Sequence, residues 1–305
     1  MSITQPGSGT ITHAGSDEPG AIAGTAGPGL VPAGFQERCI ELPAGRVNYV
    51  ESGEGETLLL LHGGYGSWQH WQANLDALSR RFHVIGMDMP GFGESDALEG
   101  ALTIEVLSQA VADAACSIIR NKKGANAQPR CSILAFSFGT TVAVEMARMH
   151  PERVAAMLLL SPPAIMPVPK ELLDIQSRAA ESARREGFMA GVRVTAHEAM
   201  LWDHALIDET VLEIIARGVR RCRVKSREIS RAMSMLPIME KLAMPLRVLY
   251  GEHDPFYRSR IDEFLRRTRD AVGLQGADLV RDCSHWIQYE KPEVVLKEAH
   301  ALFGH

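Results

Sequence analysis

The sequence predicts an α/β fold with a mostly parallel open sheet, helices on both faces and a helical lid inserted between two strands. First, short apolar runs alternate with segments of helical spacing over most of the chain, which is typical of parallel strands joined by helices. Second, this alternation stops at residues 163–236, which are rich in Ala, Arg, Glu and Met and contain no convincing strand. We therefore expect a core formed by residues 35–162 and 237–305 and a lid, residues 163–236, that does not fold alone.

The expected elements of the first half begin after residue 35. Two alternating segments separated by Pro43, Ala44 and Gly45 predict a hairpin. A short apolar run follows, of the kind that is buried in a parallel sheet. Thr103 is a suitable N-cap for the last helix of this half, with Glu105 in its first turn. In order, we expect strands at residues 38–42, 46–50 and 57–61, a helix at 68–80, a strand at 82–86 and a helix at 103–120.

The second half repeats the pattern on both sides of the insertion. A polar loop at residues 121–130 precedes it, and the alternation returns after residue 236. In order, we expect a strand at residues 130–135, a helix at 142–149 with helix-like sequence from 139, a strand at 154–160, and then a strand at 246–250, a helix at 259–271, a strand at 277–281 and a helix at 292–303.

Composition restricts the function. The chain has 305 residues, 46% hydrophobic and 23% charged, which suits one large α/β domain or one domain with an insertion. A net charge of −5 gives no sign of the basic surface with which proteins bind nucleic acid. The sequence contains no Cys-x-x-Cys pair and no His-Glu-x-x-His motif, so we expect no metal and no cofactor. Five scattered cysteines indicate reduced intracellular thiols.

The amino-terminal segment differs from the rest of the chain. Residues 1–34 are rich in Gly, Ala, Thr, Ser and Pro and contain no aromatic residue, and they lack the basic start and apolar core of a secretory signal. We interpret them as a disordered leader. The most apolar stretch, residues 154–168, contains three prolines and is too short to span a membrane. We therefore expect a cytoplasmic protein with no membrane partner, and the sequence leaves homo-oligomerisation open.

Ser137 is the candidate nucleophile. It lies where the apolar run meets the helix-like segment, and the small residues Ala135 and Gly139 stand two positions to either side. This layout is typical of a sharp strand-to-helix turn that lifts a serine hydroxyl out of the sheet, and bulk at the flanking positions would clash. The helix start also places unpaired backbone N–H groups beside the serine. Small-x-Ser-x-Gly alone occurs by chance, so a base and an acid are needed to support the assignment.

A serine nucleophile requires a base and a carboxylate that orients it. Of the eleven histidines, His285 directly follows the last expected strand, where ligand-facing residues lie in an open α/β sheet. His253 is an alternative base only if its loop has the opposite orientation. Asp254 follows the strand at residues 246–250 and its glycine turn, with Glu252 as the alternative acid. We interpret His62 as shaping a glycine loop and the remaining histidines, such as the one at position 70, as structural or surface residues.

Several motifs carry a family resemblance. His62-Gly-Gly-Tyr-Gly-Ser67 resembles the oxyanion loop of α/β-hydrolases, and Asp88-Met-Pro-Gly-Phe-Gly-Glu-Ser95 resembles the loop after their fourth strand, although its Pro and Gly residues also simply build a turn. Together with the serine turn, Gly251-Glu-His-Asp254 and His285, the resemblance covers nearly everything from residue 35 to 303. The order Ser137, Asp254, His285 is the order found in that family.

The resemblance implies a mechanism. His285 would accept the Ser137 proton, Asp254 would hold its tautomer, and the backbone N–H groups of Phe138 and Gly64, or alternatively Gly63, would stabilise the oxyanion. A serine at this position argues against dehalogenases and epoxide hydrolases, which resemble this fold but use a carboxylate nucleophile.

Within the family, His285-Trp-Ile-Gln-Tyr-Glu290 is similar to the segment after the histidine in C–C bond hydrolases that cleave ring-opened aromatic catabolites. Those enzymes use a lid arginine to hold a substrate carboxylate. Arg220, Arg227 and Arg231 share one helical face by spacing, and Arg220 is our candidate for this clamp, although a solvated basic face is the alternative. The chain departs from those enzymes at Phe136, where they have a polar Asn, and at Thr140, where they have Gly.

The sequence therefore predicts a serine hydrolase that cleaves a carboxylic ester or the C–C bond of a vinylogous diketone. The substrate would be a small apolar or aromatic molecule, with or without a carboxylate. We expect it to contact Gly63, Tyr65, Phe136, Trp286 and Arg220. Two alternatives are a cofactor-free oxygenase or perhydrolase on the same fold and a non-catalytic ligand-binding module.

Overall fold

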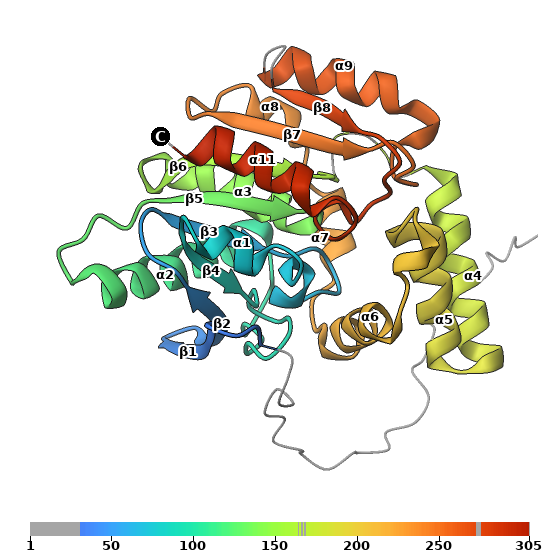
Figure 1. Ribbon diagram of the computed structural model, residues 1–305, viewed down its shortest axis with the longest axis horizontal. Coiled ribbons are helices and arrows are strands. Elements are labelled where there is room, and N and C mark those ends of the chain that lie inside the picture. Colours follow the sequence, from blue (N-terminus) through green and yellow to red (C-terminus); the bar gives the residue numbers. More distant parts are fainter. Residues whose placement is uncertain (1–30, 164, 166, 168, 273–275, 305) are drawn as a thin grey trace, which may run out of the picture.

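The computed structural model describes residues 31–163, 165, 167, 169–272 and 276–304. The expected leader therefore lies outside the described residues except for positions 31–34. At the centre is an eight-stranded sheet with the strand order β1-β2-β4-β3-β5-β6-β7-β8 (Figure 1). β2 pairs antiparallel with β1 and β4, and the remaining neighbours pair in parallel. The predicted mostly parallel α/β sheet is confirmed.

All eight expected strands are present, with ends that differ from the prediction by no more than two residues. The amino-terminal hairpin is confirmed, with its two strands in register from Gln36 opposite Glu51 to Leu42 opposite Gly45. The strands are β1 (Gln36–Leu42), β2 (Gly45–Ser52), β3 (Thr57–Leu61), β4 (His83–Met87), β5 (Cys131–Phe136), β6 (Val154–Leu160), β7 (Leu246–Gly251) and β8 (Ala277–Val280).

The helices of the core agree less closely with the sequence pattern. The single helix expected at residues 68–80 is wrong, because the structure has a 3₁₀ turn at Trp68–Trp71 and then a short helix. In a 3₁₀ turn, residues three apart lie on one side, so Trp68 and Trp71 are both buried. Thr103 caps the next helix as predicted by accepting the Val106 N–H at 3.3 Å. The core helices are α1 (Leu75–Ser79), α2 (Ile104–Lys123), α3 (Phe138–Met149), α9 (Ile261–Val272), α10 (Ile287–Glu290) and α11 (Pro292–Phe303).

The sheet is covered on both faces, as expected. In β3, Leu59 and Leu61 pack in one hydrophobic cluster with residues of α2 and α3, whereas Leu58 and Leu60 pack in a second cluster with residues of α1 and α11. This alternation follows from the two-residue period of a strand. All four leucines are fully buried, and burial of each stabilises the fold by about 1.5–3 kcal/mol.

Residues 163–236, which we call the insertion, lie between β6 and β7, and the regular elements among its described residues are helical. Figure 1 shows α4, α5 and α6 grouped beside one end of the sheet. The elements are α4 (Lys170–Glu186), α5 (Phe188–Thr195), a π turn (Ala196–Met200), a 3₁₀ turn (His204–Leu206), α6 (Glu209–Arg221) and α7 (Ser226–Arg231), with α8 (Leu236–Met239) at the boundary. Among the described residues, no helix has both the length and the apolar character needed to cross a bilayer.

The carboxyl ends of the central strands meet at one edge of the sheet. Phe136 is opposite Leu160, and Leu160 is opposite Leu249, so the residues that follow β5, β6 and β7 lie side by side. A Cβ on Gly251 would lie 2.0 Å from the carbonyl oxygen of Ser284, so only glycine allows this close approach of the two segments. The loops after β7 and β8 are thereby brought to the end of β5, where Ser137 is found.

Candidate active site

Ser137 occupies the one-residue turn between β5 and α3. Its backbone has φ 47° and ψ −120°, a conformation that non-glycine residues rarely adopt and that is typical of a strained strand-to-helix turn. A Cβ on Gly139 would lie 2.4 Å from the Leu61 carbonyl oxygen and 2.6 Å from that of His62. A small residue is therefore required two positions after the serine, because α3 starts directly against the end of β3.

The structure brings Ser137, His285 and Asp254 together. The serine Oγ lies 2.9 Å from His285 Nε2, and His285 Nδ1 lies 2.6 Å from Asp254 Oδ2. The second carboxylate oxygen accepts the backbone N–H of Phe256 at 2.9 Å. All three members are buried. With Nδ1–H donating to the carboxylate, Nε2 is free to accept the serine proton.

Neighbouring groups hold the His285 ring in place. Phe256 stacks on the imidazole with ring centroids 4.4 Å apart, and Phe136 contacts it at 4.9 Å. The hydroxyl of Ser161, the residue after β6, donates to the His285 carbonyl oxygen at 3.2 Å. Neither Ser161 nor Phe256 is singled out by a sequence motif, although Ser161 directly follows β6 and Phe256 comes two residues after Asp254.

Two backbone N–H groups beside the serine are unpaired. Among the described residues, no acceptor bonds the N–H of Gly64 or of Phe138, the first residue of α3. The N–H of Gly63, in contrast, donates to His70 Nδ1 at 3.3 Å. The geometry therefore favours Gly64 over Gly63 as the partner of Phe138 at an oxyanion.

The alternative acid and base lie elsewhere. Glu252 accepts the backbone N–H of Asp282 at 3.1 Å, and the ring of His253 stacks on Trp202 at 3.5 Å. Within the described part of the chain, Glu252, His253 and Asp282 are the group whose ligand atoms, all within 4.8 Å of one another, could hold a metal ion. Asp282 is exposed, and Glu252 and His253 are partly exposed and already paired in this way, so we assign the group no metal.

A cavity of about 970 Å³ opens beside Ser137 and His285. Tyr65, Phe136 and Phe138 line it, as does Gly64. The insertion contributes most of the remaining apolar lining, which includes Ile165, Leu172, Leu173, Ile175, Ala179, Ala180, Ala199, Met200, Ile215, Val219 and Met233. The cavity therefore suits an apolar group bound next to the serine.

Three residues expected to contact substrate do not line this cavity. Gly63 is not a lining residue, and its N–H is taken up by the bond to His70. Trp286 is fully buried, and its indole N–H donates to the His70 carbonyl oxygen at 3.0 Å. Arg220 lies over the Phe188 ring at 4.7 Å and pairs with Glu213 at 3.8 Å, both on the surface of the insertion.

The expectation that three insertion arginines share one helical face is wrong. α6 ends at Arg221 and α7 starts at Ser226, so Arg220 is on a different helix from Arg227 and Arg231. Those two arginines line the cavity. Arg227 lies over the Tyr65 ring at 5.1 Å, and within the described residues neither arginine has a carboxylate partner.

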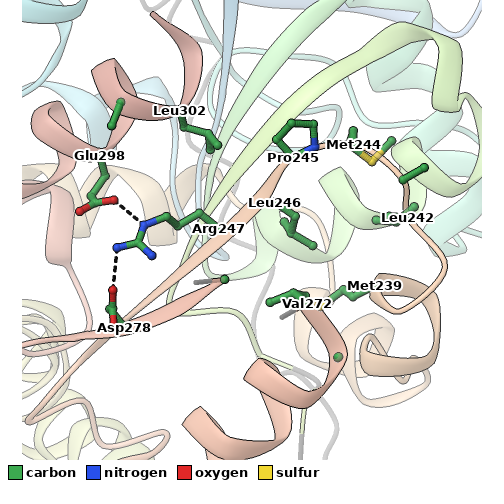
Figure 2. Close-up of a pocket in the computed structure, with 14 residues that line it drawn as sticks. Met239, Leu242, Met244, Pro245, Leu246, Arg247, Val272, Asp278, Glu298 and Leu302 are labelled. Atoms are coloured by element: carbon green, nitrogen blue, oxygen red, sulfur yellow. Dashed lines mark hydrogen bonds and ion pairs between the residues drawn. The ribbon is translucent and has the colours of Figure 1, made fainter. Parts of the chain in front are cut away.

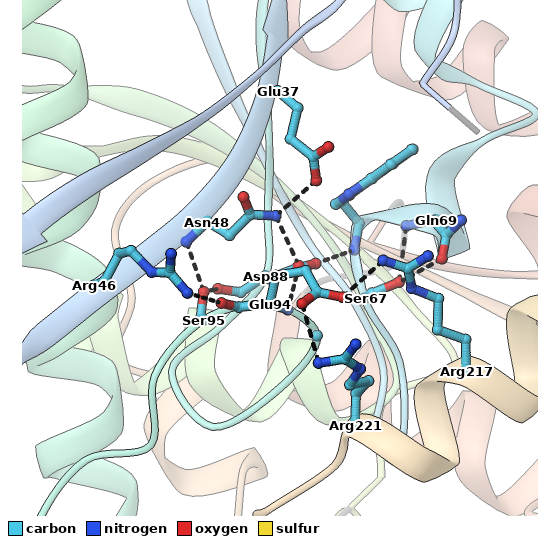
Figure 3. Close-up of polar contacts among 12 residues, drawn as sticks. Glu37, Arg46, Asn48, Ser67, Gln69, Asp88, Glu94, Ser95, Arg217 and Arg221 are labelled. Carbon is cyan, nitrogen blue, oxygen red and sulfur yellow. Dashed lines mark hydrogen bonds and ion pairs between the residues drawn. The ribbon is translucent and has the colours of Figure 1, made fainter. Parts of the chain in front are cut away.

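The loop at residues 88–95 supports the insertion, and it does not contact the cavity. The buried Asp88 carboxylate accepts the backbone N–H groups of Trp68 at 2.8 Å and Glu94 at 3.0 Å and the amide of Asn48 at 3.0 Å (Figure 3). Burial nevertheless raises the pKa of Asp88 to about 6. The Glu94 side chain binds Arg217 at 2.7 Å and Arg221 at 3.2 Å, so the loop anchors α6.

A second cavity of about 860 Å³ lies at the opposite, amino-terminal end of β7 (Figure 2). Met239, Leu246 and Val272 form part of its wall, and Arg247 binds Glu298 and Asp278 across it. Its described lining residues include no serine, cysteine or histidine. This cavity therefore offers no serine or cysteine nucleophile and no histidine base, and both of its carboxylates are paired with Arg247, so the first cavity is the candidate active site.

Comparison with known proteins agrees with the fold. The chain is 23% identical over 267 residues to 2-hydroxy-6-oxo-6-(2'-aminophenyl)hexa-2,4-dienoic acid hydrolase of Metapseudomonas resinovorans, covering 85% of this chain and 88% of that protein. It is 24% identical over 264 residues to 2-hydroxy-6-oxo-6-phenylhexa-2,4-dienoate hydrolase of Comamonas testosteroni, covering 81% and 87%. Naproxen esterase (carboxylesterase NP) from Bacillus subtilis shares the fold with a TM-score of 0.72 at 18% identity, covering 90% of this chain and 93% of that structure.

The expected resemblance to α/β hydrolases, with C–C bond hydrolases and carboxylesterases among the relatives, is thereby confirmed. Residues 56–209, just over half of the chain, match the family described as alpha/beta hydrolase fold. With that match and the observed sheet, the chain belongs to the α/β-hydrolase family.

Proposed function

We propose that the protein is a serine hydrolase that cleaves a carbonyl substrate carrying an apolar acyl or aryl group. The observation that supports this most directly is the chain of short contacts from Ser137 Oγ to His285 Nε2 at 2.9 Å and from His285 Nδ1 to Asp254 at 2.6 Å. This chain opens onto the apolar cavity of about 970 Å³.

In the proposed mechanism, His285 takes the Ser137 proton as the oxygen attacks the substrate carbonyl, and later returns a proton to the leaving group. Asp254 keeps the imidazole in the tautomer with Nδ1 protonated. The unpaired N–H groups of Gly64 and Phe138 bind the oxyanion, and removal of one such donor costs about 3–4 kcal/mol of transition-state stabilisation in other enzymes.

We further propose that the insertion acts as the lid of the site. It provides most of the apolar lining of the cavity. Ser226 of α7 also lies close to Gly64, because a Cβ added to Gly64 would be 2.7 Å from Ser226 Oγ. A cover of this kind excludes water from the reacting groups, which strengthens the electrostatic interactions that stabilise the oxyanion.

The residues that line the cavity are compatible with two classes of substrate. Phe136 beside the serine and the apolar lining suit a carboxylic ester with a bulky apolar group. Arg227 and Arg231, which line the cavity without a carboxylate partner among the described residues, favour a substrate that also carries a carboxylate, such as a ring-opened aromatic dienone whose C–C bond is cleaved.

The test is kcat/KM for a short p-nitrophenyl ester and for a ring-opened aromatic dienone carboxylate, with Ser137→Ala as the blank. A dienone preference of about a hundredfold, equivalent to about 2.7 kcal/mol, identifies C–C cleavage, and an ester preference identifies a carboxylesterase. Turnover of both substrates no faster than the blank would overturn the proposal, as would failure of a fluorophosphonate to label Ser137.

The arginines have an internal control. Arg231→Leu and Arg227→Leu should lower kcat/KM for the carboxylate substrate and leave that for the neutral ester unchanged. Arg220→Leu removes the same charge outside the cavity and should change neither value. Equal effects of all three substitutions would show that the arginines act only through the surface potential.

A further inference from the structure

His70 is a buried polar residue of the cavity wall to which the proposed mechanism assigns no task. Its side chain is 2% exposed and lines the cavity together with Ser137 and His285. Phe136 contacts its ring at 5.5 Å and Trp286 contacts it at 5.1 Å, and Trp286 also donates its indole N–H to the His70 carbonyl oxygen. The imidazole is therefore fixed from the side of the protein.

The hydrogen bond from Gly63 defines the tautomer of His70. The backbone N–H of Gly63 donates to Nδ1 at 3.3 Å, so Nδ1 presents a lone pair and the neutral ring carries its proton on Nε2. Burial, with smaller contributions from His62 and His285, holds the pKa of His70 well below the ordinary value. The ring is accordingly a neutral N–H donor at neutral pH.

The donor itself is unused. Within the described residues, His70 Nε2 has no hydrogen-bond partner, and this atom is not fully buried. The small accessible area of the atom therefore belongs to the cavity that the ring lines. Gly63, whose N–H binds this ring, is next to the reacting serine, because a Cβ on Gly63 would lie 3.2 Å from Ser137 Cβ.

We propose that His70 is a specificity-determining residue whose Nε2–H donates a hydrogen bond to an acceptor oxygen of the substrate, namely a keto or ether oxygen a few atoms from the scissile carbonyl. The inference rests on the proposed hydrolase function and narrows its substrate class. In an apolar cavity, a substrate without such an oxygen leaves the donor unpaired, whereas a substrate that carries it satisfies the donor. A site of this kind discriminates more strongly than apolar contacts can.

The experiment compares p-nitrophenyl esters that differ by one atom. p-Nitrophenyl 3-methoxypropanoate and 4-methoxybutanoate are paired with the pentanoate and hexanoate, in which a methylene replaces the ether oxygen. For at least one pair, the wild-type preference in kcat/KM for the ether should fall about tenfold in His70→Leu. His70→Gln, whose amide N–H can replace Nε2–H, should keep most of that preference, and His204→Leu, an exposed histidine of the insertion, should keep all of it.

A preference that is the same in wild type and His70→Leu for both pairs would overturn the inference, even if both esters react more slowly, because uniform slowing is what a purely structural role predicts. The same comparison is made for binding in the Ser137→Ala background, by calorimetry with the intact esters. An ether preference in binding that depends on His70 without any hydrolysis by the wild type would refute the hydrolase function alone. Hydrolysis without this preference would refute only the role of His70.

Discussion

Glu290 joins the insertion to the loop that carries His285. It lies in α10 and is 7% exposed. One carboxylate oxygen accepts the backbone N–H groups of Trp202 at 2.8 Å and Asp203 at 2.6 Å, and the other accepts the N–H of Ser284 at 2.8 Å. We predict that Glu290→Ala destabilises the protein and lowers activity together, because the substitution releases both segments.

The magnitude follows from the three bonds. Hydrogen bonds to a charged group contribute about 1.5–3 kcal/mol each, and a buried N–H left unpaired costs about 1–3 kcal/mol. Water can enter the space left by the side chain and bind part of the released N–H groups, so we expect a loss of about 3–5 kcal/mol in the free energy of unfolding. Glu290→Gln keeps one acceptor oxygen but turns its amide toward a backbone donor, so its loss should be about 2 kcal/mol.

The assay is urea unfolding followed by tryptophan fluorescence, combined with kcat/KM on a p-nitrophenyl ester. Glu293→Ala is the matched control, since this glutamate is exposed in the first turn of α11 and should change the unfolding free energy by less than about 0.5 kcal/mol. A loss below about 1 kcal/mol in Glu290→Ala, or a large loss with unchanged kcat, would refute the argument that this carboxylate fixes the position of the histidine loop.

Three further predictions concern other parts of the fold. Gly139→Ala should lower the unfolding free energy by more than about 3 kcal/mol or prevent folding, because its Cβ would meet the Leu61 carbonyl oxygen at 2.4 Å, and near-normal stability in urea would contradict this. Arg217→Ala should lower the unfolding free energy by about 1–2 kcal/mol in the same assay, because the half-buried Glu94 then keeps only Arg221, its more exposed partner. Burial lowers the pKa of His62 to about 4, below the value of about 6.5 in the unfolded chain, so stability should fall by about 3 kcal/mol as pH drops from 6.5 to 4. His62→Gln should remove that part of the pH dependence of urea unfolding, and an unchanged slope would show that the histidine does not cause it.

The sheet could be predicted from the sequence because its signals are local. The run at residues 58–61 is leucine at every position, and the structure buries each of them between two layers of helices. The position of Ser137 at the end of such a run, and of His285 after the last strand, follows from the same rule that strand ends meet at one edge. The sequence therefore predicts that the two residues are neighbours.

The insertion could not be predicted in the same detail. Helical spacing placed Arg220 on one face with Arg231, but the chain leaves the helix at Cys222 and starts a new one at Ser226. The backbone at this break is held from outside, since the N–H of Arg223 donates to the carbonyl oxygen of Gly91 at 2.9 Å. A tertiary hydrogen bond of this kind leaves no periodic trace in the sequence.

His70 was missed for a related reason. Its position in a short segment after a glycine loop is compatible with a satisfied structural histidine, and half of that interpretation is correct, because Nδ1 accepts the Gly63 N–H. What distinguishes it is the second nitrogen, which has no partner among the described residues and belongs to a residue of the cavity wall. Such a difference between two atoms of one ring can be seen only in three dimensions.

The contacts of the histidine loop show that the insertion, our proposed lid, also helps to position this loop. The Ser284 hydroxyl donates to the Ala199 carbonyl oxygen at 3.2 Å, and the backbone N–H of Trp286 donates to the Met200 carbonyl oxygen at 2.9 Å. These bonds flank His285 on both sides in the sequence, so the position of its imidazole depends on residues of the insertion as well as on the core. A displacement of the π turn at Ala196–Met200 would therefore move the His285 ring relative to Ser137. Substitutions in this turn should for that reason lower kcat as well as alter the choice of substrate.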